Sequence, residues 1–153
     1  MTPSQTIGPF FTHALPYPEG PLVVPLSQPH SFWVRGKVFD GAAAPVPDAL
    51  IESWQVGDGF SGFGRCPTDE EGNWAVHTVK APYLALSVFA RGLLHRVVTR
   101  VYFPDQEQLN AADPVLAGLG EAARATLIAR AADDGYTFDI HLQGEHETTF
   151  FAL

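Results

Sequence analysis

The stretch KAPYLALSVFARGLLHRVVTRVYF, residues 80–103, carries the pattern that decides the fold. Large aliphatic side chains alternate with smaller or polar ones over residues 84–89, and a second alternation follows over residues 97–103, after a break at residues 91–96. Two alternating runs around one break are typical of a β-hairpin or of two adjacent strands that bury one face. We therefore expect paired strands here. The residues that head them, where we expect any site, are Tyr83, Ala85 and Arg100.

The rest of the chain repeats the same period-two pattern in several short runs. We expect further strands at residues 32–39, 49–56, 73–79, 136–142 and 148–153. The glycine-rich residues 57–64 interrupt the pattern and are expected to form a loop. Apolar side chains at helical spacing over residues 115–132 predict one or two short helices. The expected fold class is mainly β, an antiparallel β-sandwich with a short helical insertion near residues 105–132.

Residues 1–29 differ in character, because they are rich in proline and also carry apolar side chains such as Phe10 and Val23. This mixture is too irregular for a helix and too apolar for a disordered tail. We expect an ordered, extended arm that packs on the core or on a partner chain. A chain of 153 residues with 46% hydrophobic residues is long enough for one core. Residues 30–153 are therefore expected to form a single β-sandwich domain.

The charge and the cysteine content argue against several classes of function. A formal net charge of -8 with 9 scattered basic residues argues against binding to nucleic acid. Cys66 is the only cysteine, so a disulfide framework or a thiolate metal cluster is excluded and a buried structural thiol is expected. The first residues lack a basic segment followed by an apolar one, and no apolar run reaches the length of a membrane span. We expect a cytoplasmic protein that binds no membrane.

The sequence contains no self-contained metal or catalytic motif. A β-sandwich most simply supplies two metal ligands as a His-x-His pair on one strand face, and no such pair occurs. The histidines are better interpreted as surface or hydrogen-bonded residues than as ligands. They are His13, His30, His77, His95, His141 and His146. Neither a Gly-x-Ser-x-Gly elbow nor a phosphate-binding glycine loop is present, and the acidic runs at residues 69–71 and 133–134 are interpreted as turns.

Arg100 stands out because it interrupts an apolar strand with a permanent positive charge. A guanidinium group can bind a carboxylate through two parallel hydrogen bonds. Arg100 is therefore a candidate for carboxylate capture, and a structural ion pair is an equally good interpretation on these grounds.

Six segments, in order along the chain, carry a resemblance to a known family. They are TPSQTIGPFF (2–11), PVPDALIESWQ (45–55), GFGRCPTDEEGNW (62–74), FARGLL (89–94), TRVYF (99–103) and FDIHLQGEHETTFF (138–151). Together they resemble the α subunits of the protocatechuate 3,4-dioxygenases, within the intradiol ring-cleavage dioxygenase family. The resemblance runs from Thr2 to Phe151, so it is more specific than any single motif. It implies a β-sandwich and the cleavage of a catechol ring by dioxygen at a ferric ion.

The resemblance further implies that the homologous, catalytic β subunit holds Fe(III) with two tyrosines and two histidines, the latter in an Ala-His-x-His strand. Tyr83 and Ala85 stand at the two histidine positions of this chain and are expected to be vestigial metal positions. No tyrosine occurs from residue 18 to residue 82, where the tyrosine ligands would be sought. We therefore expect no catalytic residue, no metal and no cofactor in this chain, and no activity of the chain alone. The Fe(III) is expected in the partner β subunit.

The resemblance also implies that this chain acts by assembling with the partner subunit and forming part of its substrate pocket. Thr6, Gly8, Pro9 and Arg100 match α-subunit positions that line the substrate pocket, so a small aromatic substrate is expected at the subunit interface. The implied reaction converts protocatechuate to 3-carboxy-cis,cis-muconate in the β-ketoadipate pathway of aromatic catabolism. For the segment from Thr6 to Pro9, plain packing at the interface is the alternative.

Two other functions stay open at this point. Residues 36–41, 45–51 and 68–73 are also similar to transthyretin-like and carboxypeptidase-regulatory-like domains, so a non-enzymatic β-sandwich binding module is the runner-up. That similarity covers less than half of the chain and leaves both terminal segments unexplained. The third possibility is an α-like chain that has lost its partner and works in another pathway.

Overall fold

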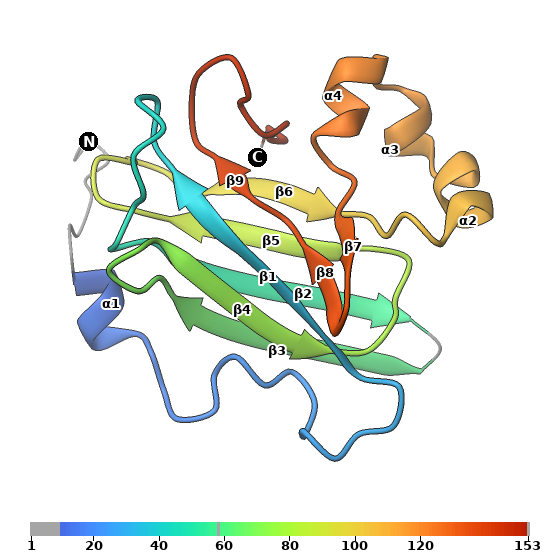
Figure 1. Ribbon diagram of the computed structural model, residues 1–153, viewed down its shortest axis with the longest axis horizontal. Coiled ribbons are helices and arrows are strands. Elements are labelled where there is room, and N and C mark those ends of the chain that lie inside the picture. Colours follow the sequence, from blue (N-terminus) through green and yellow to red (C-terminus); the bar gives the residue numbers. More distant parts are fainter. Residues whose placement is uncertain (1–9, 58, 153) are drawn as a thin grey trace, which may run out of the picture.

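The computed structural model describes residues 10–57 and 59–152, and its strands form two sheets packed face to face (Figure 1). The strands are β1 (Phe32–Phe39), β2 (Leu50–Gly57), β3 (Phe60–Pro67), β4 (Asn73–Thr78), β5 (Leu84–Phe89), β6 (Val97–Val101), β7 (Arg130–Ala132), β8 (Gly135–Thr137) and β9 (Ile140–His141). The helices are α1 (Phe11–Ala14), α2 (Glu107–Ala112), α3 (Pro114–Ala117) and α4 (Glu121–Ala125). One sheet has the strand order β4-β1-β8-β7, with β9 also paired to β1, and the other has the order β3-β2-β5-β6.

The strands β5 and β6 form the antiparallel pair expected within residues 80–103. Leu84, Leu86 and Val88 point between the sheets, where they are fully buried. Ala85 lies directly opposite Arg100 on the other face of the pair. The expected pairing is confirmed, and the buried face explains its register, because a slip by one residue would turn every aliphatic side chain outward.

The expected mainly β sandwich with a helical insertion is also confirmed. Most neighbouring strands pair antiparallel, but β8 and β9 run parallel to β1. The helices α2, α3 and α4 lie together at one end of the sandwich, beside β6 and β7 (Figure 1). They cover the outer side of the sheet there, where Tyr102, Leu116 and Leu127 form a small second core.

The prediction of a loop at residues 57–64 is wrong, because β3 begins at residue 60 and pairs with β2 along its whole length. Its glycines are required by packing and not by a turn. A Cβ atom on Gly62 would lie 2.4 Å from Cγ1 of Val23, and one on Gly64 would lie 2.7 Å from Cγ2 of the same residue. The N-terminal arm therefore approaches β3 so closely that only glycine fits.

Two predicted element boundaries need correction at the C-terminal end. The helical pattern over residues 115–132 ends at residue 125, and residues 130–132 instead form β7, because they pair with the returning β8. The strand expected at residues 148–153 is reduced to an isolated bridge between Phe151 and Val98. The hydroxyl of Thr99 donates a hydrogen bond to the carbonyl of Thr149 at 2.8 Å. This side-chain bond takes the place of one backbone hydrogen bond of a regular ladder.

The arm contains one helical turn, α1, which the irregular composition did not predict. Beyond α1 the arm runs along β3 and β4, the edge strands of the two sheets (Figure 1). The backbone N–H of Val23 donates to the carbonyl of His77 at 2.9 Å, and the N–H of His77 donates to the carbonyl of Pro21 at 2.8 Å. Arg65 donates from Nη1 to the carbonyl of Leu15 at 2.8 Å. These bonds protect strand edges that would otherwise be open. The domain boundary at residue 30 stays a prediction.

No helix in the described part of the chain is long and apolar enough to cross a membrane.

Candidate functional site around Arg100

Arg100 projects from β6 on the outer face of its sheet, where it stacks on an aromatic ring. Its guanidinium carbon lies 4.0 Å from the centre of the Tyr83 ring and 5.7 Å from the centre of the Phe151 ring. Nη1 donates to the hydroxyl of Tyr102 at 3.1 Å and lies 3.8 Å from Oδ2 of Asp113. The side chain keeps 27% of its surface exposed. A cation that is held on two sides and still accessible is suited to binding an anion.

Asp113 connects Arg100 to the helical insertion. Its Oδ1 accepts the hydroxyl of Tyr102 at 3.1 Å, and the same oxygen caps α3 by accepting the backbone N–H groups of Val115 and Leu116 at 2.8 and 3.0 Å. Burial raises the pKa of Tyr102 above its ordinary value, although the neighbouring Arg100 opposes that change. The phenol therefore stays protonated and serves as a fixed bridge between the helix cap and the guanidinium group.

One edge of the Arg100 guanidinium group is open. In the part of the chain that the structure describes, Nη1 alone has polar partners, and Nε and Nη2 make neither a hydrogen bond nor an ion pair. Nε–H and Nη2–H point in parallel, which is the geometry that a carboxylate accepts with both oxygens. The arrangement thus combines the two interpretations drawn from the sequence, since one corner of the group is used structurally and one edge has no polar partner among the described residues.

The two positions expected to be vestigial metal positions, Tyr83 and Ala85, lie beside Arg100. Tyr83 supplies the ring beneath the guanidinium group, and Ala85 faces Arg100 across the β5–β6 pair. Residues 10–57 and 59–152 contain no group of three or more His, Cys, Asp or Glu side chains that could hold a metal ion. Thr6, Gly8 and Pro9 lie outside the described residues, so their expected role stays a prediction.

An exposed apolar surface continues from this cluster across the sheet. Trp54 of β2 lies opposite Ala85, so that Trp54, Ala85 and Arg100 form one row over three strands. Trp54 is 52% exposed and Val56 is 72% exposed, and the Trp54 ring packs against Phe63 at 4.8 Å between centres. We call Trp54, Val56 and Phe63 the Trp54 patch. Exposed aromatic and aliphatic side chains on one face are typical of a surface that another chain covers.

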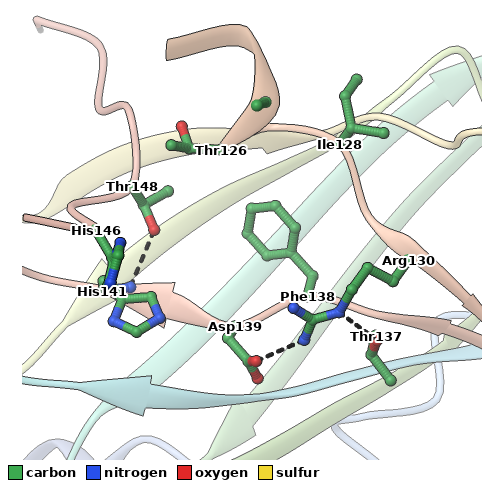
Figure 2. Close-up of a pocket in the computed structure, with 10 residues that line it drawn as sticks. Thr126, Ile128, Arg130, Thr137, Phe138, Asp139, His141, His146 and Thr148 are labelled. Atoms are coloured by element: carbon green, nitrogen blue, oxygen red, sulfur yellow. Dashed lines mark hydrogen bonds and ion pairs between the residues drawn. The ribbon is translucent and has the colours of Figure 1, made fainter. Parts of the chain in front are cut away.

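A second group of polar residues lines a small cavity of about 150 Å³ near β7, β8 and β9 (Figure 2). The rings of His141 and His146 lie 6.1 Å apart there, and Nη2 of Arg130 donates to Oδ2 of Asp139 at 2.7 Å. The turn at residues 145–146, which follows Gly144, brings the two histidines together. The cavity shares no lining residue with the Arg100 cluster.

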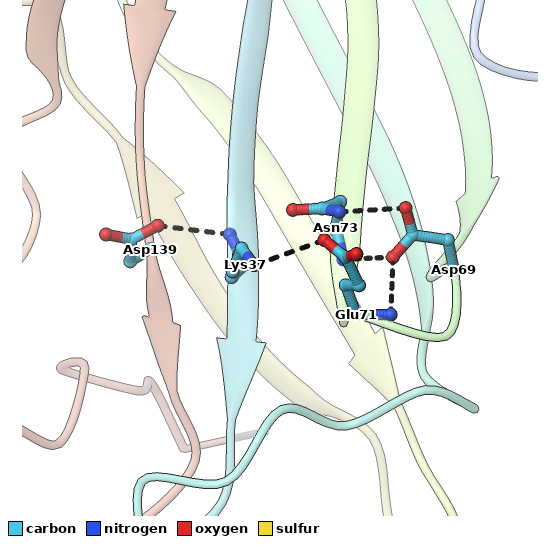
Figure 3. Close-up of polar contacts among 5 residues, drawn as sticks. All are labelled: Lys37, Asp69, Glu71, Asn73 and Asp139. Carbon is cyan, nitrogen blue, oxygen red and sulfur yellow. Dashed lines mark hydrogen bonds and ion pairs between the residues drawn. The ribbon is translucent and has the colours of Figure 1, made fainter.

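The acidic run at residues 69–71 forms a turn, as expected (Figure 3). Oδ1 of Asp69 accepts the backbone N–H groups of Glu71 and Asn73, and Oδ2 accepts the side-chain amide of Asn73. These hydrogen bonds, led by that of the Asn73 side chain, hold the pKa of Asp69 below its usual value. Lys37 Nζ lies 3.8 Å from Glu71, and its backbone N–H donates to Asp139. The carboxylates of Asp69, Glu71 and Asp139 therefore take part in contacts that stabilise the fold.

Cys66 is buried, as expected for a structural thiol. Burial raises the pKa of the thiol, although a hydrogen bond from the backbone N–H of Ala75 opposes that change. A thiol of raised pKa that lies inside the protein is a poor nucleophile.

Comparison with solved structures defines the class of protein to which this fold belongs. The chain is similar to the dioxygenase domain of a dioxygenase carbohydrate-binding protein fusion from Streptomyces sp. SirexAA-E, with a TM-score of 0.63, 27% identity and coverage of 94% of this chain and 98% of that chain. It also shares the fold of catechol 1,2-dioxygenase from Acinetobacter sp. ADP1, with a TM-score of 0.56, 16% identity and coverage of 78% and 55%. A scan against models of protein families finds no match. The fold is that of the intradiol dioxygenases.

Curated relatives narrow this class to one family. The chain is 38% identical to the protocatechuate 3,4-dioxygenase alpha chain of Burkholderia cepacia, in an alignment that covers 99% of this chain and 96% of that protein. It is 35% identical to the alpha chain of Pseudomonas putida, with coverage of 98% and 95%. The beta chain of Burkholderia cepacia is 32% identical, with coverage of 75% and 65%. This chain belongs to the protocatechuate 3,4-dioxygenase alpha chain family, which confirms the resemblance found in the sequence.

The chain is shorter than these relatives in places. The alignment with the Burkholderia cepacia alpha chain extends over 190 positions, whereas this chain has 153 residues, so it lacks segments that the relative has. Its β2–β3 connection is short, because Gly57 and Phe60 already pair with each other. The neighbouring Trp54 and Val56 are 52% and 72% exposed.

Proposed function

We propose that this chain is the non-iron-binding alpha subunit of a protocatechuate 3,4-dioxygenase, and that it completes a pocket in which a homologous beta subunit holds Fe(III). The observation that carries the proposal is the relationship to two alpha chains over nearly the whole length of this chain. The related beta chain supports an assembly of two similar subunits. The proposed reaction is intradiol cleavage of protocatechuate to 3-carboxy-cis,cis-muconate, a step of the β-ketoadipate pathway, in the cytoplasm.

The described residues of this chain do not fit a ferric ion. Ala85 offers no ligand atom, and the Tyr83 ring is covered by the guanidinium group of Arg100. A fixed positive charge close to a metal position disfavours a cation there. The proposal therefore assigns the iron to the partner subunit.

Arg100 has the role of orienting the substrate in this proposal. Its open Nε–Nη2 edge binds the ring carboxylate of protocatechuate, and a hydrogen-bonded pair of this kind contributes about 1.5–3 kcal/mol. Fixing the carboxylate orients the ring, which lowers the entropic cost of the reaction at the partner's metal. Thr6, Gly8 and Pro9 are proposed to form a further part of the pocket wall.

Metal analysis and an oxygen-uptake assay on the chain purified alone and on the complex co-purified with its beta partner test the proposal. The expected result is no bound iron and no ring cleavage for the chain alone, and both for the complex. Stoichiometric iron in the isolated chain, or cleavage of protocatechuate without a partner, contradicts the proposal. A chain that purifies with no beta-type partner from its native cells contradicts the assembly.

A further inference from the structure

We propose that the outer face of the β4-β1-β8-β7 sheet carries a binding site for a small molecule with two or more carboxylate groups on an apolar body. A cavity of about 470 Å³ lies there, within the range of about 300–1,000 Å³ that is usual for small-molecule sites. It lies on the sheet opposite to the one that carries Arg100. The inference goes beyond the proposed function and does not depend on it, because every residue of the site belongs to this chain.

The register of the sheet explains why its outer face is hollow here. Ala75 of β4 and Thr137 of β8 lie directly opposite Arg35 of β1, one on each side, and Arg130 of β7 lies opposite Thr137. Residues in one such row point to the same face of the sheet. Small side chains between and beside the two long ones leave a depression. The apolar part of its lining consists of Gly36, Cys66, Trp74 and Ala75.

Three positively charged side chains border the cavity. They are Arg35, Lys37 and Arg130, a third of the 9 lysines and arginines in a chain whose formal net charge is -8. Neighbouring strands lie about 4.8 Å apart, so Arg35 and Arg130, which have β8 between them, leave the sheet about 10 Å apart. Lys37 lies two residues along β1 from Arg35, a further distance of about 7 Å. The positive charges therefore surround the apolar lining.

Arg35 has hydrogen-bond donors that no described residue uses. Its side chain donates only from Nη1, to the exposed Asp134, and its guanidinium carbon lies 4.9 Å from the centre of the Trp33 ring. Nε and Nη2 make no hydrogen bond within residues 10–57 and 59–152. Trp33 lies on the far side of Arg35 from Lys37, so the guanidinium group does not fill the space between Arg35 and Lys37.

Lys37 and Arg130 also keep unused donors. Nζ of Lys37 makes no hydrogen bond to a described residue and lies 3.8 Å from Oε2 of the exposed Glu71. Arg130 donates from Nη2 to Asp139 and, at 3.4 Å, from Nε to Thr137, while Nη1 has no partner in the same part of the chain (Figure 2). Ion pairs as exposed as these contribute little, so a carboxylate of a ligand can replace them.

Two carboxylates line the cavity as well, but their oxygens already accept hydrogen bonds. Asp69 accepts three within its turn, and Asp139 accepts one from the backbone N–H of Lys37 and one from Arg130 (Figure 3). The cavity thus has more unused donors than unused acceptors. This excess favours an anionic ligand.

The spacing of the cations favours several carboxylates over one compact anion. A guanidinium group binds a carboxylate through two parallel hydrogen bonds. A phosphate ion at one of the two arginines cannot reach the other, which leaves the sheet two strands away, whereas carboxylates at separate positions of one ring or unsaturated chain can reach both. The apolar lining then contacts the ring or chain between them. The product of the proposed reaction, a tricarboxylate with an unsaturated chain, belongs to this class.

Isothermal titration calorimetry on the full chain at low salt tests the proposal, with benzene-1,3,5-tricarboxylate as the probe. One saturable site is expected, and benzoate is expected to bind at least about tenfold more weakly. Arg35→Gln and Lys37→Gln are each expected to raise the Kd for the tricarboxylate about three- to tenfold. Arg96→Gln removes the same charge from an exposed arginine outside the cavity and is expected to change the Kd by less than about twofold.

Ala75→Leu tests the same site without changing a charge. The larger side chain is expected to fill the depression and abolish binding, while the thermal stability of the chain stays the same. This variant and Lys37→Gln decide the matter if Arg35→Gln does not fold.

Three results would overturn the proposal. They are no saturable binding up to about 10 mM tricarboxylate, equal affinity for benzoate, and the same loss in Arg96→Gln as in Lys37→Gln, which would show general attraction of an anion to the protein. Because the chain is titrated without a beta partner, failure to assemble with that partner contradicts the proposed function alone.

Discussion

At the scale of single residues, Lys80 shows how a charge is accommodated within an aromatic cluster. Its Nζ lies 4.0 Å from the ring centre of Tyr136, 4.3 Å from that of Phe103 and 5.2 Å from that of Phe32. The same Nζ donates to Oδ1 of Asp105 at 2.7 Å. The hydrogen bond from Lys80 is the main cause that holds the pKa of Asp105 below its usual value.

We predict that Lys80→Met, which keeps the apolar stem, lowers the free energy of unfolding at neutral pH by about 1–2 kcal/mol. Because the folded pKa of Asp105 lies below the unfolded value, its contribution is present above pH 3.8 and is lost as the pH falls through the folded pKa. The difference between the two proteins is therefore expected to shrink towards pH 3. Urea titrations at several pH values measure it, with Lys37→Met, whose Nζ lies 3.8 Å from Glu71 and not beside Asp105, as the control. A difference independent of pH would contradict the role of Asp105.

At this scale the sequence alone identified Arg100 as a candidate site residue, but it did not identify the residues that contact Arg100. A charge inside an apolar alternation is a local signal, so Arg100 could be singled out. Its partners could not be found in the same way, because no local pattern links Asp113, which precedes Pro114, to Arg100. The contact exists only after the chain folds α3 back against Tyr102.

At the scale of elements, the contact between β3 and the N-terminal arm depends on the absence of side chains at two glycines. We predict that Gly64→Ala lowers the free energy of unfolding by about 1–3 kcal/mol, because the new methyl group would lie 2.7 Å from Val23 and 2.8 Å from Oγ of the buried Ser53. Adding Val23→Ala is expected to restore part of the loss. Gly120→Ala is the control, since its Cβ meets no atom within 4 Å. Equal stability of the two single variants would show that the arm does not press on β3.

The same glycines explain why β3 was missed in the sequence. A strand is visible as an alternation of side chains, and glycine contributes none, so residues 57–64 had the composition of a loop. The strands β1, β2, β4 and β5 were predicted within one or two residues, because each carries large apolar side chains on one face. The ends of the helical insertion were misjudged, since residues 130–132 become a strand only when β8 lies beside them.

At the scale of the whole molecule, the Trp54 patch is the surface that we expect the beta subunit to cover. We predict that Val56→Asp prevents co-purification with the partner while the isolated chain keeps its thermal stability, because the side chain is 72% exposed and buries no charge until the chains meet. Leu109→Asp on α2, where the side chain is 51% exposed, is the matched control. Assembly that withstands Val56→Asp would place the interface elsewhere.

The sequence by itself determined that the chain is a β-sandwich, which strands pair within residues 80–103, and that it is related to protocatechuate 3,4-dioxygenase alpha chains. These properties follow from side-chain periodicity and from motifs, which are local in the chain. Only the tertiary structure decided that Tyr83, Tyr102 and Asp113 surround Arg100 and that its Nε–Nη2 edge has no polar partner among residues 10–57 and 59–152. Contacts between a strand, a helix cap and a ring depend on how the layers pack, and local sequence patterns do not predict packing distances.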